Sequence, residues 1–132
     1  MTANTSPIFT LTPNALPVSL SAANTERIYS SGTLVTVVTA GANGSRIEAL
    51  KATASATTTA GVIRYWITDA AGANPKLFEE RLVTAVTPST TVKVFEDFWT
   101  LDKPIVLASG QLLRASTHNA ETFNINAIAG DF

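Results

Sequence analysis

The side chains of this chain that could perform nucleophilic or acid–base chemistry are few and dispersed. His118 is the only histidine, and Ser116 and Asp131 are the residues that could complete a Ser-His-Asp arrangement with it. Such a triad needs its three side chains in hydrogen-bonding register. Ser116 and His118 on one strand would share a face about 6–7 Å apart, whereas Asp131 follows the next apolar run, and the sequence has no G-x-S-x-G elbow. We therefore expect no catalytic role for His118.

Paired carboxylates and metal ligands are no better placed. The pairs Glu79-Glu80 and Glu96-Asp97 are adjacent in sequence, and adjacent residues of a strand face opposite sides, so neither pair can share one site. One histidine, no cysteine and no EF-hand loop leave nothing with the spacing of metal ligands. The stretch "GANGS" at 41–45 lacks the lysine and the helix of a phosphate loop. We expect no catalytic, metal-binding or cofactor-binding residue, and no enzyme activity.

The composition argues against several partner classes. Charged residues make up 14% of the chain and the net charge is −1, against about 25% charged residues in an average domain, so there is no basic excess for nucleic acid. No window of about 18 apolar residues could span a membrane, and residues 1–16 lack the basic and apolar regions of a signal peptide. The absence of cysteine suits synthesis in a reducing cytoplasm. The Thr- and Ala-rich surface suits either contact with other proteins or a solvated face.

Turn signals at short intervals predict an all-β fold. The clearest strand is "GVIRYWITD" at 61–69, whose apolar residues alternate with period two. Residues 46–56 also have helix-like spacing, but they lie between hairpin-type corners and we favour a strand. Further strands are expected at 33–40, 76–86, 91–101, 103–107, 112–116 and 122–128. We predict an antiparallel β-sandwich, jelly-roll-like, with an Ig-like sandwich as the alternative.

Both ends of the chain carry apolar residues outside the clearest strands. Residues 1–16 contain Pro7 and Pro13 and are expected to form an extended N-terminal arm, and residues 17–132 a single β-sandwich domain. The apolar residues of the arm either lie across its own domain or reach a neighbour. Residues 112–128 are expected to form a terminal hairpin with its corner at 117–121. Phe132 would then cap the core or touch a partner.

The densest aromatic cluster is "VFEDFWTL" at 94–101. Period two places Phe95 and Trp99 on one strand face and Phe98 on the other. The cluster could pack into the core with one ring exposed, or form a carbohydrate platform or a protein contact; Trp66 is a second candidate for an exposed aromatic side chain. The candidate partner contacts of the whole chain are Ile8, Phe9, Leu11, Trp99 and Phe132.

Several stretches together resemble small structural proteins encoded among the virion genes of tailed bacteriophages and prophages. The most specific are "TAGANGSRI", "TTTAGVIR" and "LRASTHNAETFNINAIAGDF", and the resemblance covers about residues 18 to 132. It implies a capsid cement or decoration protein that binds between major capsid subunits and stabilises the head. It further implies synthesis in the host bacterial cytoplasm and a place on the outer capsid surface. The implied partners are the major capsid protein and other copies of the chain, as a homodimer or homotrimer.

Two other functions remain open at this point. The chain could be another virion part, such as a tail component, a head-fibre base or a host-receptor-binding module. It could also be a small β-sandwich enzyme or sugar-binding domain. An extended apolar arm favours the cement protein, whereas exposed aromatic side chains would favour a host-binding module.

Overall fold

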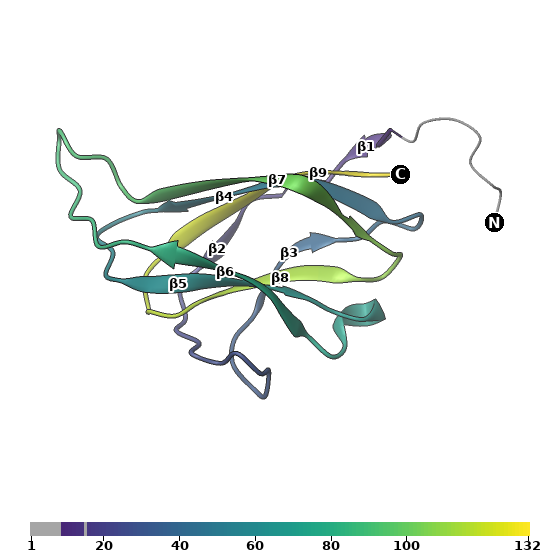
Figure 1. Ribbon diagram of the computed structural model, residues 1–132, viewed down its shortest axis with the longest axis horizontal. Helices are drawn as coiled ribbons and strands as arrows, with labels where there is room; N and C mark the ends of the chain where they lie inside the picture. Colours follow the sequence, from purple (N-terminus) through teal and green to yellow (C-terminus); the bar gives the residue numbers. More distant parts are fainter. Residues whose placement is uncertain (1–8, 15) are drawn as a thin grey trace.

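A computed structural model describes residues 9–14 and 16–132 and contains nine β-strands. Within this part of the chain the only helical element is a single 3-10 turn, η1 (Ala70–Gly72). The strands are β1 (Thr12–Pro13), β2 (Val18–Leu20), β3 (Val35–Thr39), β4 (Ser45–Ala54), β5 (Gly61–Ile67), β6 (Lys76–Val83), β7 (Glu96–Leu107), β8 (Leu112–Thr117) and β9 (Phe123–Asp131). They form two layers, which confirms the predicted antiparallel β-sandwich (Figure 1).

The strand order distinguishes the jelly roll from the Ig-like alternative. One sheet, here called the β9 sheet, has the order β1-β9-β4-β7, with β2 also paired to β9; the other, the β8 sheet, has the order β3-β8-β5-β6. From β2 onward the chain changes sheets at every connection except β5–β6. Eight strands ordered β2-β9-β4-β7 against β3-β8-β5-β6 form a jelly roll. The structure therefore has the jelly-roll connectivity that was predicted first.

The expected terminal hairpin is wrong. Strand β8 pairs with β3 and β5, whereas β9 pairs with β4, β1 and β2. The corner at 118–122 therefore carries the chain from one sheet to the other. A period-two pattern shows which residues of a strand share a face, but it is identical for a hairpin and for a corner between stacked sheets.

The helix-like spacing of residues 46–56 has its origin in a β-bulge. These residues belong to β4, as predicted, and the register of β4 shifts between Ile47 and Ala49 against both of its neighbours. A bulge adds one residue to a strand and thereby resets its alternation. Ile47 and Leu50, three residues apart, consequently both face the core with no measurable exposure.

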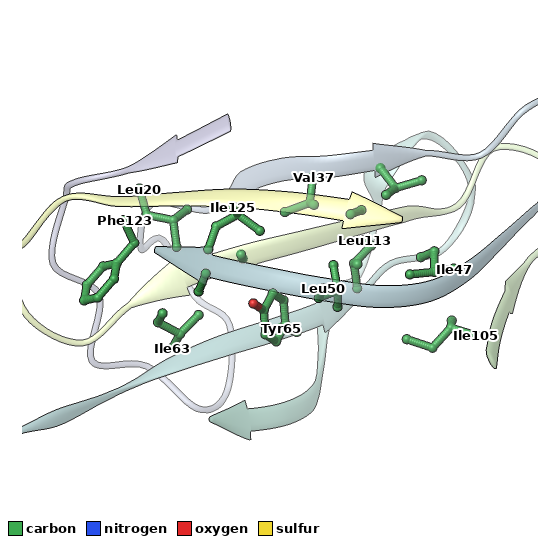
Figure 2. Close-up of a cluster of buried hydrophobic side chains, with 14 of the residues drawn as sticks. Leu20, Val37, Ile47, Leu50, Ile63, Tyr65, Ile105, Leu113, Phe123 and Ile125 are labelled. Atoms are coloured by element: carbon green, nitrogen blue, oxygen red, sulfur yellow. The ribbon is translucent and has the colours of Figure 1, made fainter. Parts of the chain in front are cut away.

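The core lies between the two sheets and is built from their inward-facing side chains (Figure 2). The β9 sheet contributes Leu50, Phe123 and Ile125, and the β8 sheet contributes Ile63 and Leu113, all at most 1% exposed. Each such side chain stabilises the fold by about 1.5–3 kcal/mol through removal from water. In the absence of cysteine, this packing must supply the stability that disulfides give to other small domains.

Two isoleucines of β9 provide a matched test of this packing. Ile125 is fully buried, whereas Ile128, three residues later on the outer face, is 51% exposed. Ile125→Ala should lower the free energy of unfolding by about 2–5 kcal/mol because it leaves a cavity, and Ile128→Ala by less than about 1 kcal/mol. Denaturant unfolding of both variants measures the difference. Equal losses would contradict the assignment of the two faces of β9.

Candidate interaction surface

The three side chains that could have formed a Ser-His-Asp triad make three separate structural contacts. The Ser116 hydroxyl accepts a hydrogen bond from the Trp66 indole at 3.0 Å, and Nδ1 of His118 accepts one from Arg64 at 3.3 Å. Asp131 accepts a hydrogen bond from the Asn14 amide at 2.8 Å. Among the described residues there is also no group of three His, Asp or Glu side chains that could hold a metal ion.

The adjacent carboxylates likewise have separate partners. Asp97 forms an ion pair with Arg81 at 2.9 Å, whereas its neighbour Glu96 lies near Lys51 and Lys93 at 3.6 and 3.3 Å. The two carboxylates thus face opposite sides of β7, as the alternation predicts. Both carboxylates are thus engaged in ion pairs within the fold. The surfaces described next are formed by exposed apolar and aromatic side chains.

The described part of the predicted arm lies against the last strand of its own domain. Leu11 donates its backbone N–H to the Asp131 carbonyl at 2.7 Å, and Asn14 donates to the Ala129 carbonyl at 3.0 Å. The side chains of Phe9, Leu11 and Leu16 nevertheless remain 77%, 83% and 77% exposed. We call these three residues the N-terminal stripe. The segment that carries the stripe is hydrogen-bonded to β9 at Leu11 and Asn14, while the apolar side chains of the stripe face solvent; Ile8 lies outside the described residues.

Asp131 fastens this segment to the sheet. Its carboxylate accepts hydrogen bonds from the Asn14 amide and the Ser45 hydroxyl. The bond from Ser45, followed by that from Asn14, lowers the pKa of Asp131 below its ordinary value, although burial acts in the opposite direction. Gly41 allows the approach, because a Cβ at this position would lie 2.8 Å from the Asp131 carboxyl group. Asp131 therefore joins the N-terminal segment, β4 and the corner before it.

Three of the candidate partner contacts lie in the same region. Phe132 is half-buried, and its N–H donates to the Gly44 carbonyl at 3.1 Å. It directly follows Asp131, whose carbonyl accepts from Leu11, so Phe132 lies beside Leu11 where β1 runs along β9. Leu16 lies further along β9, toward β2. The structure thus brings Phe9, Leu11 and Phe132 to one end of the β9 sheet.

Trp99 lies elsewhere, at the side of the sandwich where β6 and β7 are the outermost strands. It is half-buried, shares a face with buried Phe95, and lies opposite Phe98, which is 52% exposed; the predicted alternation of the three rings is confirmed. The Trp99 ring packs against Tyr65 and Phe78 at centroid distances of 5.8 and 6.4 Å.

An open cleft of about 350 Å³ adjoins Trp99, and we call it the aromatic cleft. It is lined by Phe78, Glu79, Trp99, Leu101, Asp102 and Lys103. Phe78 is not among the site residues predicted from the sequence. This residue falls at the register shift between β5 and β6, opposite the step from Tyr65 to Trp66, and no periodic signal marks such a bulge in the sequence.

The outer faces of the two sheets differ. Residues 21–34 lie across the outer face of the β8 sheet (Figure 1), and Tyr29 packs edge-on against Trp66 at 6.5 Å. Trp66 is consequently fully buried, so its expected role as an exposed aromatic side chain is wrong. The outer face of the β9 sheet instead exposes Phe98, Val106 and Ile128 by 52%, 64% and 51%.

Comparison with known proteins gives a limited result. No family model and no curated protein matches the chain. Two crystal structures of a pentameric capsid protein isolated from metagenomic phage sequences are similar, each at 18% identity, with TM-scores of 0.43 and 0.42. The matches cover 89% of this chain and 59% and 67% of the capsid chains. Similarity at this level assigns neither a family nor a function. No helix in the described residues has the length and apolarity needed to cross a membrane.

The contribution of the Asp131 contacts should depend on pH. Because the folded-state pKa lies below the ordinary value of 3.8, the stabilisation is complete above that pH and is lost as the pH falls through the lowered pKa. Asp131→Asn should therefore lower the free energy of unfolding by about 1 kcal/mol near neutral pH. The difference from wild type should shrink on acidification. Urea unfolding between neutral pH and pH 2 measures it, with Ser45→Ala expected to behave similarly. A difference independent of pH would contradict this role.

Proposed function

We propose that the protein is a structural component of a bacteriophage virion, and specifically a cement or decoration protein of the head. In this role it binds between major capsid subunits on the outer surface of the shell. The observation that carries the proposal is the N-terminal stripe. Phe9, Leu11 and Leu16 expose most of their apolar surface, although the segment that bears them is hydrogen-bonded to β9. The resemblance of residues 18–132 to phage virion proteins supports the same role.

The physical character of the stripe suits contact with a repeating lattice. Burying each of its side chains in a partner would contribute up to about 1.5–3 kcal/mol, before the cost of association. Because the backbone is already hydrogen-bonded, less conformational freedom is lost on binding than for a free tail. A modest interface of this kind becomes effective when several copies bind neighbouring lattice positions. Association of the chain with copies of itself, as a dimer or trimer, belongs to the same proposal.

The second candidate is a host-receptor-binding part of the virion, and the aromatic cleft is the observation that favours it. Phe78 is 49% exposed beside half-buried Trp99, and Glu79, Asp102 and Lys103 supply polar groups at the rim. Aromatic rings with neighbouring polar groups are a common way to bind glycans and protein hot spots. The Trp99 ring already has protein neighbours, however, with the Arg81 guanidinium at 5.1 Å from its centroid and tilted contacts to Tyr65 and Phe78, which leaves less of the ring for a ligand than an open platform would.

Shell binding tests the first candidate. The triple variant Phe9→Ser, Leu11→Ser, Leu16→Ser should lose most of its co-sedimentation with assembled phage heads, by about tenfold or more in affinity. A matched control replaces three apolar residues exposed elsewhere, Ile28→Ser, Leu82→Ser and Val92→Ser, which are 88%, 78% and 47% exposed. Both variants should melt close to the wild-type temperature. Undiminished binding by the first variant, or no binding of the wild type to any shell, would overturn the proposal.

Adsorption to host cells tests the second candidate. If the aromatic cleft binds a receptor, Phe78→Ala should reduce adsorption of the protein to host cells by about tenfold, because it removes an exposed ring from the cleft. Phe98→Ala removes a similarly exposed ring from the opposite face of β7 and serves as the control. Equal adsorption by wild type and both variants would remove the basis for a receptor-binding role.

A further inference from the structure

A second open cleft lies on the outer face of the β8 sheet, away from the N-terminal stripe and the aromatic cleft. Its volume is about 310 Å³, and it is lined by Arg27, Ala60, Gly61, Val62, Arg64 and His118. Three of the six lining residues carry nitrogen donors. The other three are small or apolar. We call this the arginine cleft.

Arg64 forms the fixed part of the arginine cleft. Its side chain is 1% exposed, and three acceptors hold its guanidinium. Nε donates to Glu80 at 2.9 Å, Nη1 to the Asn24 carbonyl at 3.1 Å, and Nη2 contacts Nδ1 of His118 at 3.3 Å. A buried guanidinium with this number of partners has little freedom to reorient.

The contact with Arg64 also determines the proton position on His118. A guanidinium nitrogen can only donate, so Nδ1 of His118 must accept. The imidazole proton of the neutral ring then resides on Nε2, which is a hydrogen-bond donor.

Arg27 and Arg64 both pair with the carboxylate of Glu80 at the arginine cleft. Arg27, whose side chain is 66% exposed, donates through Nε to both oxygens of Glu80 at 3.0 and 3.2 Å. Burial alone would raise the pKa of Glu80, but the hydrogen bonds and charges of Arg27 and Arg64 outweigh it and the pKa is lowered. Two guanidinium groups thus share one ionised carboxylate. The carboxylate of Glu121 is also nearby, where it accepts from the backbone and hydroxyl of Thr59 at 2.8 and 3.1 Å. Its donors are neutral, so the two carboxylates together balance the two arginines.

The donors that remain are suited to a carboxylate. For the terminal guanidinium nitrogens of Arg27, the described residues provide no hydrogen-bond partner, and these nitrogens form the planar fork that binds carboxylates in two-point contacts. Ala60, Gly61 and Val62 supply a wall against which methylene groups can pack. Gly61 lets Asn119 and His118 approach this wall closely, because a Cβ at position 61 would lie 2.7 Å from the Asn119 amide and 3.6 Å from the Cβ of His118.

We propose that the arginine cleft binds a carboxylate, and that the carboxylate is an aspartate or glutamate side chain of a protein partner. The two terminal nitrogens of Arg27 match the two oxygens of such a side chain. A phosphate group near neutral pH carries about −1.5 to −2, more than the single exposed guanidinium of Arg27 can match. The inference does not depend on the proposed virion role, because it follows from the local charge and hydrogen bonds alone.

The test is a solution NMR titration of the full-length protein with N-acetyl-glutamate α-amide, which carries only the side-chain carboxylate. Saturable shifts are expected for the backbone amides of Gly61 and Val62 and for the side-chain Nε–H signals of Arg27 and Arg64. Arg27→Ala leaves Arg64 and Glu80 balanced and should weaken binding about fivefold or more, whereas Arg27→Lys, which keeps the charge but loses the fork, should fall between.

Arg46→Ala is the matched control, since Arg46 lies on β4 and pairs with Glu48 at 3.3 Å; its affinity should equal that of the wild type. Inorganic phosphate, titrated at the same ionic strength, separates the two anion sources. The proposal is overturned if the glutamate analogue gives no saturable shift, if Arg27→Ala binds as tightly as the wild type, or if phosphate binds more tightly than the analogue. The fold is not at risk in the key variant, because Arg27 is largely exposed.

Discussion

The burial of the Arg64 guanidinium is the interaction on which the outer surface of the β8 sheet depends. An unpaired charge in this position would cost several kcal/mol, so the acceptors that surround it are a condition of the fold. One of them is the Asn24 carbonyl, and this contact ties residues 21–34 to the β8 sheet. The same segment buries Trp66. Residues 21–34 therefore cover Arg64 and Trp66 on the outer face of the β8 sheet, whereas Phe98, Val106 and Ile128 stay exposed on the outer face of the β9 sheet.

Strand β9 determines what the open sheet presents. It pairs with β4 along one edge and with β1 and β2 along the other, so the two ends of the described chain meet on it. Asp131 adds side-chain contacts to Asn14 and Ser45 at that meeting point. These hydrogen bonds give the N-terminal segment a defined place on the surface. The N-terminal stripe therefore differs from an exposed loop whose apolar residues have no fixed position. The N-terminal segment, the end of β9 and the proposed contact surface therefore lie together.

The alternation of apolar residues was sufficient to predict the two-layer fold and the opposite faces of Phe98 and Trp99. It was insufficient wherever a β-bulge shifted the register of a strand, or where residues 21–34 covered the outer face of a sheet. The bulge in β4 imitated helical spacing around Ile47 and Leu50, and the crossing from β8 to β9 had the pattern of a hairpin. Arg64 and Trp66 alternate as an outward, solvated face should, yet both are buried because residues 21–34 cover them. Local periodicity contains no information about such a cover, so the arginine cleft could not be inferred from the sequence.

The low charge of the chain makes its ion pairs few and partly shared. Six of the nine basic residues take part in ion pairs within the fold. Two carboxylates each pair with two cations: Glu80 with Arg27 and Arg64, and Glu96 with Lys51 and Lys93. The pair at Glu80 differs because one of its cations, Arg64, is buried and held by three acceptors, so its position is fixed. Arg27 keeps its terminal nitrogens toward solvent, and a carboxylate from outside would bind them on a face that the N-terminal stripe does not use.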